Sequence, residues 1–220
     1  MGRFPTESVS APLNWSVVLA DDASPLRIGV FGGTFDPPHV GHLVTAVNVR
    51  HELSLDLLLL MVANVPWQKV GTRPITPAGD RLAMVAAAVA DVPGLEAGDH
   101  EIRAGGPSYT ADTLAVLAEE YPGAELFTVV GDDAAAGIRS WERADEVLDG
   151  SQMVVVDRPG EHVWLDPDVE WIRVEVPRLD VSSTDLRARW SDGRPLDYLL
   201  TDDVLDVIEQ RGLYGAESAT

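Results

Sequence analysis

The sequence predicts an α/β fold built on one doubly wound parallel sheet. Short apolar segments of strand length alternate along the chain with longer segments of helical character, and strands joined through helices pair in parallel through right-handed crossovers. The segment 57–62 is a nearly continuous apolar run, which is typical of a strand buried on both faces. The 220 residues, 45% of them hydrophobic, are sufficient for a single globular domain.

Each expected element follows from hydrophobic pattern and from glycine or proline at its ends. The segment 26–31 is an apolar strand that stops at a glycine pair. Further strands are expected at 57–62, 100–103, 126–130, 153–156 and 171–176. Helices are expected at 41–53, 81–90, 111–120, 141–148, 183–189 and 202–211. Because ligands of such sheets bind at the carboxyl ends of the strands, the loops after the strands are the places to look for a site.

Composition excludes several classes of function. The chain has 36 acidic and 16 basic residues, a net charge of -20, so we expect no nucleic-acid partner. No apolar run approaches the ~20 residues of a membrane span, so no membrane partner is expected either. Cysteine is absent, which fits a cytoplasmic protein. We expect a flexible N-terminal extension at 1–25 and one domain at 26–215; a homo-oligomer is left open.

The loop after the first strand has the composition of a phosphate site. It reads Gly-Gly-Thr-Phe-Asp-Pro-Pro-His-Val-Gly-His over 32–42. Two glycines allow a backbone to approach a phosphate closely, and the helix that follows offers free N–H groups. His39 and His42 lie three apart at the start of this helix, so both rings can face one anion. Neither the dinucleotide fingerprint nor the P-loop is present, and no third Cys or His nearby suggests zinc.

A second candidate phosphate site lies at 182–187, Ser-Ser-Thr-Asp-Leu-Arg. Ser182 and Asp185 have the spacing of a capping box, which marks the start of a helix. Ser183 and Arg187 are four apart and share one helix face. A hydroxyl, free N–H groups and a guanidinium together suit a polyphosphate, which Arg grips through two donors.

Together these strings resemble a known family. The 32–42 string is similar to the signature of the nucleotidyltransferases with the (T/H)-x-G-H motif, and most closely to that of bacterial nicotinate-mononucleotide adenylyltransferases. The 182–187 string is similar to the I-S-S-T-x-(I/L)-R element of the same superfamily, with Val181 in place of Ile. The resemblance implies a Rossmann-like nucleotidyltransferase fold. It also implies transfer of the adenylyl group of ATP, in the presence of Mg²⁺, to nicotinate mononucleotide, with release of pyrophosphate.

Four further segments carry the resemblance. Pro66-Trp67-Gln68-Lys69 resembles the P-P-H-K segment in its actinobacterial-type form, and 106–114 matches the S-Y-T-x-D-T-L stretch. Residues 131–133, with Trp141 eight residues later, match G-x-D followed by Trp, and 158–160 resembles an R-P-G loop.

The resemblance assigns roles by position. The catalytic residues that it implies are His39, His42, Lys69 and Arg187. The ATP-binding residues that it implies are Gly32, Gly33, Thr34, Phe35, His39, Gly41, His42, Asp133, Arg158, Ser182, Ser183, Thr184 and Arg187. The acceptor-binding residues that it implies are Lys69, Tyr109, Thr110, Trp141 and Glu142. In this scheme Trp141 stacks on the cationic pyridine ring, a pairing that aromatic faces favour. The backbone at Thr110 and Glu142 reads the pyridine carboxylate, and no dedicated metal site is expected.

Two other readings stay open at this point. One is transfer to a different acceptor, such as the amide mononucleotide or phosphopantetheine. The other is a non-catalytic nucleotide-binding protein on the same fold. Release of pyrophosphate with a defined acceptor distinguishes all three.

Overall fold

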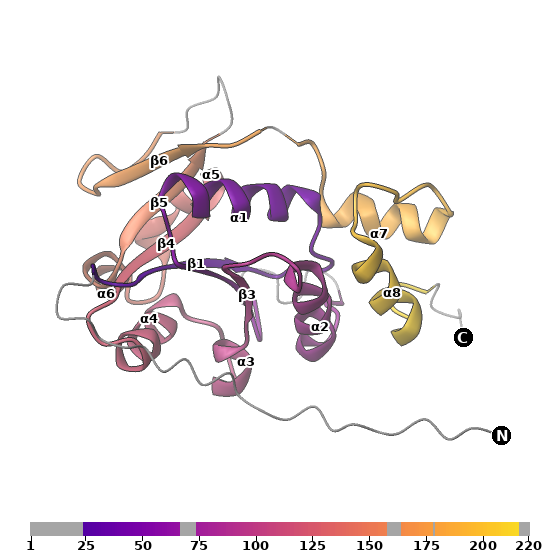
Figure 1. The fold of residues 1–220 in the computed structure, drawn as a ribbon, viewed down its shortest axis with the longest axis horizontal. Coiled ribbons are helices and arrows are strands. Elements are labelled where there is room, and N and C mark those ends of the chain that lie inside the picture. The colour runs from indigo at the N-terminus through magenta and orange to yellow at the C-terminus, as the bar shows by residue number, and fades with distance from the viewer. Residues whose placement is uncertain (1–23, 67–73, 158–163, 178, 216–220) are drawn as a thin grey trace.

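The computed structural model describes residues 24–66, 74–157, 164–177 and 179–215. Its six strands form one parallel sheet in the order β3-β2-β1-β4-β5-β6 (Figure 1). The strands are β1 Arg27–Gly33, β2 Leu57–Val62, β3 Leu95–Gly98, β4 Glu125–Gly131, β5 Gln152–Asp157 and β6 Trp171–Glu175. This topology confirms the predicted doubly wound α/β fold.

Helices cover both faces of the sheet, with α1 on one side and α4 on the other (Figure 1). The helices are α1 Val40–Glu52, α2 Ala78–Val89, α3 His100–Ala104, α4 Thr110–Glu120, α5 Asp132–Ala136, α6 Ala144–Gly150, α7 Ser183–Asp192 and α8 Asp202–Arg211. A short 3-10 helix, η2, spans Ile138–Ser140. Among the described residues no helix has the length and apolar character needed to cross a bilayer.

Each face of the sheet has its own hydrophobic core. In β2, Leu58 and Leu60 enter the core that includes α1, α2 and α8, while Leu59 and Met61 enter the core that includes α4 and α6. Successive side chains of a strand point to opposite faces, so a strand between two helical layers must be apolar throughout. This requirement explains the apolar run at 57–62.

The chain order reverses direction between β1 and β4, which are neighbours in the sheet although two strands separate them in sequence. Such a switch point leaves a crevice at the carboxyl ends of the two strands, because the loops that follow them turn to opposite faces. The loop after β1 is the 32–42 string, so the topology places that string at the crevice.

Two of the expected elements were wrong. The segment 100–103 is not a strand but part of α3, and the third strand is β3, just before it. Both elements are too short for a hydrophobic period to distinguish them. The expected helix at 141–148 begins only at Ala144, because Arg143 at its N-cap has the left-handed φ of 55°. Trp141 is therefore extended, in a link between η2 and α6.

Candidate active site

The loop after β1 is shaped around one buried aromatic ring. Phe35 has a left-handed φ of 49° and is 2% exposed. A Cβ on Gly33 would lie 2.7 Å from this ring, so position 33 has to be glycine for the loop to fold this way. Phe35 therefore lies beneath the site and shapes it, while the exposed Gly32 leaves the end of the strand open.

The two histidines of the motif stack on each other at the start of α1. Their ring centroids are 3.7 Å apart with an angle of 28° between the planes, and the edge of Phe35 packs against His42. The backbone N–H of His39 donates to Nδ1 of His42 over 3.2 Å. Because Nδ1 accepts this bond, a neutral His42 carries its proton on Nε2. His42 is thereby set to donate through Nε2.

His39 differs from His42 in that it is buried, with 7% of the residue exposed. Burial lowers the pKa of His39 to about 4, an effect that a hydrogen bond to its own backbone partly opposes. At neutral pH this ring is therefore an uncharged imidazole. Its Nδ1 is buried.

The second phosphate motif begins α7 and is attached to the first. Ser182 accepts a hydrogen bond from the backbone N–H of Asp185 and so caps the helix, as its spacing predicts. The hydroxyl of Ser183 donates to the carbonyl oxygen of Pro37 over 2.8 Å. Two strings separated by some 140 residues in sequence therefore form one structural unit.

Arg187 strengthens this connection. Its Nη1 donates to the carbonyl oxygen of Asp36 over 2.6 Å, and its Nη2 donates to the hydroxyl of Thr184. Close packing supports the same contact, since a Cβ on Gly41 would lie 3.0 Å from Val181. The structure thus brings the predicted phosphate residues of both motifs together at the carboxyl end of β1.

A cavity of about 280 Å³ opens beside this unit. It is lined by Gly32, Gly33, Thr34, Ala63, Pro66, Glu101, Ser108, Tyr109, Thr110, Trp141 and Glu142. All four of the described residues that the resemblance assigned to the acceptor are in this set, together with three of the glycine-loop residues. Sequence segments after β1, after β2, before α4 and before α6 therefore meet around one hollow.

The other predicted residues are placed as follows. Asp133 is exposed in the first turn of α5, at the carboxyl end of β4, and does not line the cavity. Lys69 and Arg158 lie outside the described residues.

Sequence reasoning missed Arg81, which holds the base of the site. It is 1% exposed and its guanidinium donates to the carbonyl oxygens of Thr34, Asn64 and Thr76 at 2.8, 3.0 and 2.8 Å. Thr34 belongs to the loop after β1, and Asn64 and Thr76 belong to the two ends of the connection between β2 and α2. One signal was available: Arg81 shares a helical face with apolar residues at spacings of three, four and seven, including Met84.

Glu101 was also missed, although it lines the cavity. Burial raises the pKa of Glu101, against the effect of hydroxyl groups of Ser108 and Thr113 that donate to it. The hydroxyl of Ser108 also accepts the backbone N–H of Asn64. These bonds connect the loop after β2 to the loop before α4.

Tyr214, which follows α8, also holds the loop after β1 in place. The hydroxyl of Tyr214 donates to Oδ1 of Asp36 over 2.7 Å, and Asp36 is 1% exposed. Burial and the neighbouring carboxylate raise the pKa of Tyr214. Arg187 therefore holds the loop after β1 by the backbone of Asp36, and Tyr214 holds it by the side chain of Asp36.

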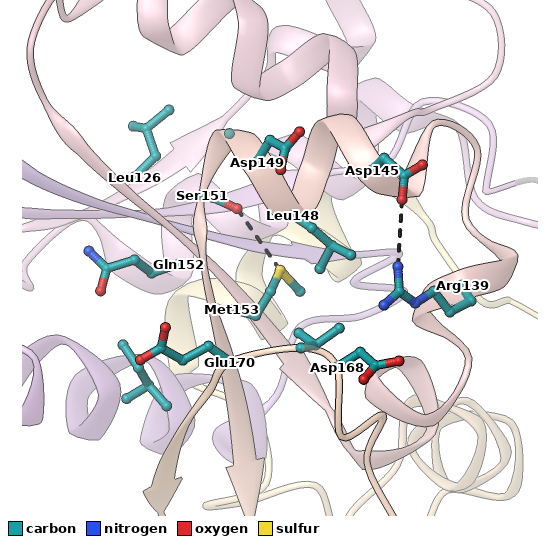
Figure 2. A pocket seen from close by; sticks show the side chains of 13 residues that line it. Leu126, Arg139, Asp145, Leu148, Asp149, Ser151, Gln152, Met153, Asp168 and Glu170 are labelled. Carbon is teal, nitrogen blue, oxygen red and sulfur yellow. Dashed lines mark hydrogen bonds and ion pairs between the residues drawn. The ribbon is translucent and has the colours of Figure 1, made fainter.

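A larger hollow, of about 870 Å³, lies at the opposite end of the sheet, where β4, β5 and β6 begin. Figure 2 shows Asp145, Asp149, Asp168 and Glu170 around it, with Arg139 bonded to Asp145. Four carboxylates repel polyphosphates. The smaller cavity, beside the two phosphate motifs, is the better candidate for a nucleotide site.

Known proteins resemble this chain over most of its length. Residues 30–189 match the Cytidylyltransferase-like family. The chain is 43% identical to a probable nicotinate-nucleotide adenylyltransferase of Corynebacterium kroppenstedtii, over 86% of this chain and 90% of the relative. It is 41% identical to a protein of the same name from Saccharopolyspora erythraea, over 87% and 91%.

A solved structure shows the same fold at low sequence identity. The Plasmodium falciparum nicotinic acid mononucleotide adenylyltransferase complexed with NaAD superimposes with a TM-score of 0.69 at 17% identity, covering 86% of this chain and 97% of that one. On the strength of the family match and of relatives above 40% identity that cover most of the chain, this protein belongs to the nicotinate-nucleotide adenylyltransferases, within the cytidylyltransferase-like nucleotidyltransferases.

Proposed function

We propose that this enzyme joins nicotinate mononucleotide to the adenylyl group of ATP through the residues described above. A phosphate oxygen of the mononucleotide attacks the α-phosphorus of ATP. The bond from the α-phosphorus to the bridging oxygen breaks, and pyrophosphate leaves with the electron pair. The nucleophile is already an anion, so the step needs no general base. The products are nicotinate adenine dinucleotide and pyrophosphate.

The carrying observation is the attachment of the Ser183–Arg187 helix start to the Asp36–Pro37 backbone. This attachment sets two groups of phosphate donors beside each other. The difficulty of the reaction is to align two polyanions, and alignment contributes up to ~7–11 kcal/mol. In our assignment Nε2 of His42 donates to the transferring phosphate, while Ser183 and Arg187 hold the leaving pyrophosphate.

His39 has a role in this proposal that does not require a positive charge. Because it is neutral at pH 7, it contributes as a hydrogen-bonding and packing partner of His42 rather than as a cation. Among the residues that the structure describes, charge neutralisation then falls to Arg187, together with the metal ion that accompanies ATP.

Mg²⁺ enters as part of the substrate, MgATP. In the described part of the chain no three His, Asp or Glu side chains are grouped to hold a metal ion. Mg²⁺ commonly keeps its water ligands and binds through substrate phosphates, which such a site accommodates. When bound, the ion offsets negative charge on the phosphates.

The acceptor ring is assigned to the cavity of about 280 Å³. Trp141 offers an aromatic face to the cationic pyridine ring, and the first backbone N–H groups of α4, at Thr110, suit a carboxylate. We assign the catalytic unit to 26–215, since β1 begins at Arg27 and Tyr214 bonds Asp36. We also place the reaction in the cytoplasm, in keeping with the cysteine-free sequence.

Pyrophosphate release from purified protein tests the proposal. The protein is incubated with ATP, Mg²⁺ and either nicotinate mononucleotide or its amide. We expect fast release with the acid and much slower release with the amide. Equal rates would remove the carboxylate-reading role from the α4 start. Absence of release with both would refute the reaction.

A further inference from the structure

The acceptor cavity has two walls that come from different parts of the chain. One wall is the start of α4, with Tyr109 and Thr110. The other is the link between η2 and α6, with Trp141 and Glu142. A flat ring is held well only if the distance between such walls matches its thickness, so whatever connects the walls controls the fit.

Arg143 makes that connection. It follows the second wall directly, and its Nη2 donates to Oδ1 of Asp112 over 2.6 Å. Asp112 lies in the first turn of α4, two residues after Thr110 of the first wall. The guanidinium also lies 6.0 Å from the centre of the Tyr109 ring, at the outer limit of a cation–π contact. The residue directly after the second wall therefore contacts α4 at Asp112 and the first wall at Tyr109.

The backbone at Arg143 indicates that this placement is specified. Its φ of 55° is unusual for a residue with a side chain. Such a conformation persists where surrounding contacts fix it. It ends the extended segment that carries Trp141 and begins α6, so it also determines the direction in which the wall enters the cavity.

We propose that the Arg143–Asp112 ion pair is a clasp that sets the spacing of the two walls, which makes Arg143 a positioning residue for the acceptor ring. The inference rests on the proposed function, because it takes the cavity to be the acceptor site. Both partners are accessible, with 35% and 56% of their side chains exposed. An accessible pair contributes modestly and is screened by salt. The clasp therefore acts on acceptor binding by a small, salt-dependent factor.

The test is Arg143→Asn, since asparagine tolerates a left-handed backbone but lacks the guanidinium. Dissociation constants for nicotinate mononucleotide are measured by calorimetry. The KM values for both substrates and kcat are measured from the rate of pyrophosphate release. We expect acceptor affinity to fall roughly three- to fivefold, with KM for ATP and kcat within twofold of the wild type. The difference in acceptor affinity between Arg143→Asn and the wild type should be largest at low salt and should approach zero at high salt. Arg143→Lys should recover part of the affinity.

Arg139→Asn is the matched control. Arg139 belongs to η2, before the same link, and forms a 2.6 Å pair with Asp166 outside the acceptor cavity. It should leave acceptor affinity unchanged. Asp112→Asn should reproduce the Arg143→Asn effect, and the double variant should add nothing further. Asp112→Asn also gives the answer if Arg143→Asn does not fold.

Each outcome bears on one idea or the other. Unchanged acceptor affinity in Arg143→Asn and Asp112→Asn overturns the clasp, as does an equal loss for ATP. Wild-type protein that binds the mononucleotide without releasing pyrophosphate refutes the proposed reaction, yet its dissociation constants still decide the clasp. Wild-type protein that does not bind the mononucleotide overturns both.

Discussion

The guanidinium of Arg187 donates a 2.6 Å hydrogen bond to the carbonyl oxygen of Asp36, across a sequence separation of 151 residues. The other terminal nitrogen, Nη2, donates to the hydroxyl of Thr184, so both ends of the guanidinium fork are held by the protein. Arg187 thereby fixes the loop after β1, and in our proposal it also holds the leaving pyrophosphate. A substitution here affects both placement of the loop and charge at the phosphates.

Arg187→Gln should lower kcat/KM for ATP by about 10- to 100-fold, because a charge-assisted phosphate contact and a loop contact are lost together. The measurement is steady-state pyrophosphate release with ATP varied. Arg189→Gln is the control, since Arg189 lies on the same helix but pairs with Asp185; it should behave like the wild type. A fully active Arg187→Gln enzyme would contradict the assignment.

His42→Ala should reduce kcat by at least ~10²-fold, by analogy with the loss of a single charge-stabilising donor. His51→Ala, an exposed change at the other end of α1, is the control and should leave kcat unaltered. Circular dichroism of both variants establishes that the fold is intact. Normal turnover by a folded His42→Ala protein would remove His42 from the reaction.

His39 should make stability depend on pH. In the unfolded chain its pKa is 6.5, and burial lowers it to about 4. Between these values the unfolded chain binds a proton that the folded protein does not, so the free energy of unfolding falls as pH falls. The resulting decrease in the free energy of unfolding is on the order of 3 kcal/mol near pH 4.

The measurement is chemical denaturation of the wild type and His39→Asn from pH 8 to 4. Carboxyl groups titrate in both proteins, so the difference between the two curves isolates His39. From about pH 6.5 downward, the free energy of unfolding of the wild type should fall relative to that of His39→Asn. Parallel curves would show that His39 is accessible to protons in the folded state.

Trp141→Leu should raise KM for nicotinate mononucleotide at least fivefold and leave KM for ATP near the wild-type value, because stacking on a cationic ring is lost. Trp164→Leu is the matched control, since Trp164 is 74% exposed and outside the cavity. Quenching of tryptophan fluorescence by the mononucleotide should disappear in Trp141→Leu alone. Quenching that persists there would place the ring elsewhere.

Much of this arrangement could be predicted from the sequence because its signals are local. The helix at 202–211 was placed at both ends, since Thr201 caps its start and Gly212 its end. The two phosphate strings follow strands, and a parallel sheet necessarily brings the loops after its strands to one edge. That rule, applied to short strings, was enough to group the phosphate residues.

The remainder depends on contacts that no local pattern encodes. Arg81 binds three backbone carbonyls, one in the loop after β1 and two in the connection between β2 and α2, and carbonyls are the same in every residue type. The Arg143–Asp112 pair depends on how α6 lies against α4. The strand β3 has only four residues, two of them buried, and its place comes from pairing with β2.

The bond between Tyr214 and Asp36 has a consequence for biosynthesis. Residue 36 is synthesised 178 residues before the partner of its side chain. A nascent polypeptide therefore lacks this contact until residue 214, which follows α8, has emerged and docked. Products of premature termination before residue 214 lack the contact as well, so the complete loop after β1 forms only once α8 has been made.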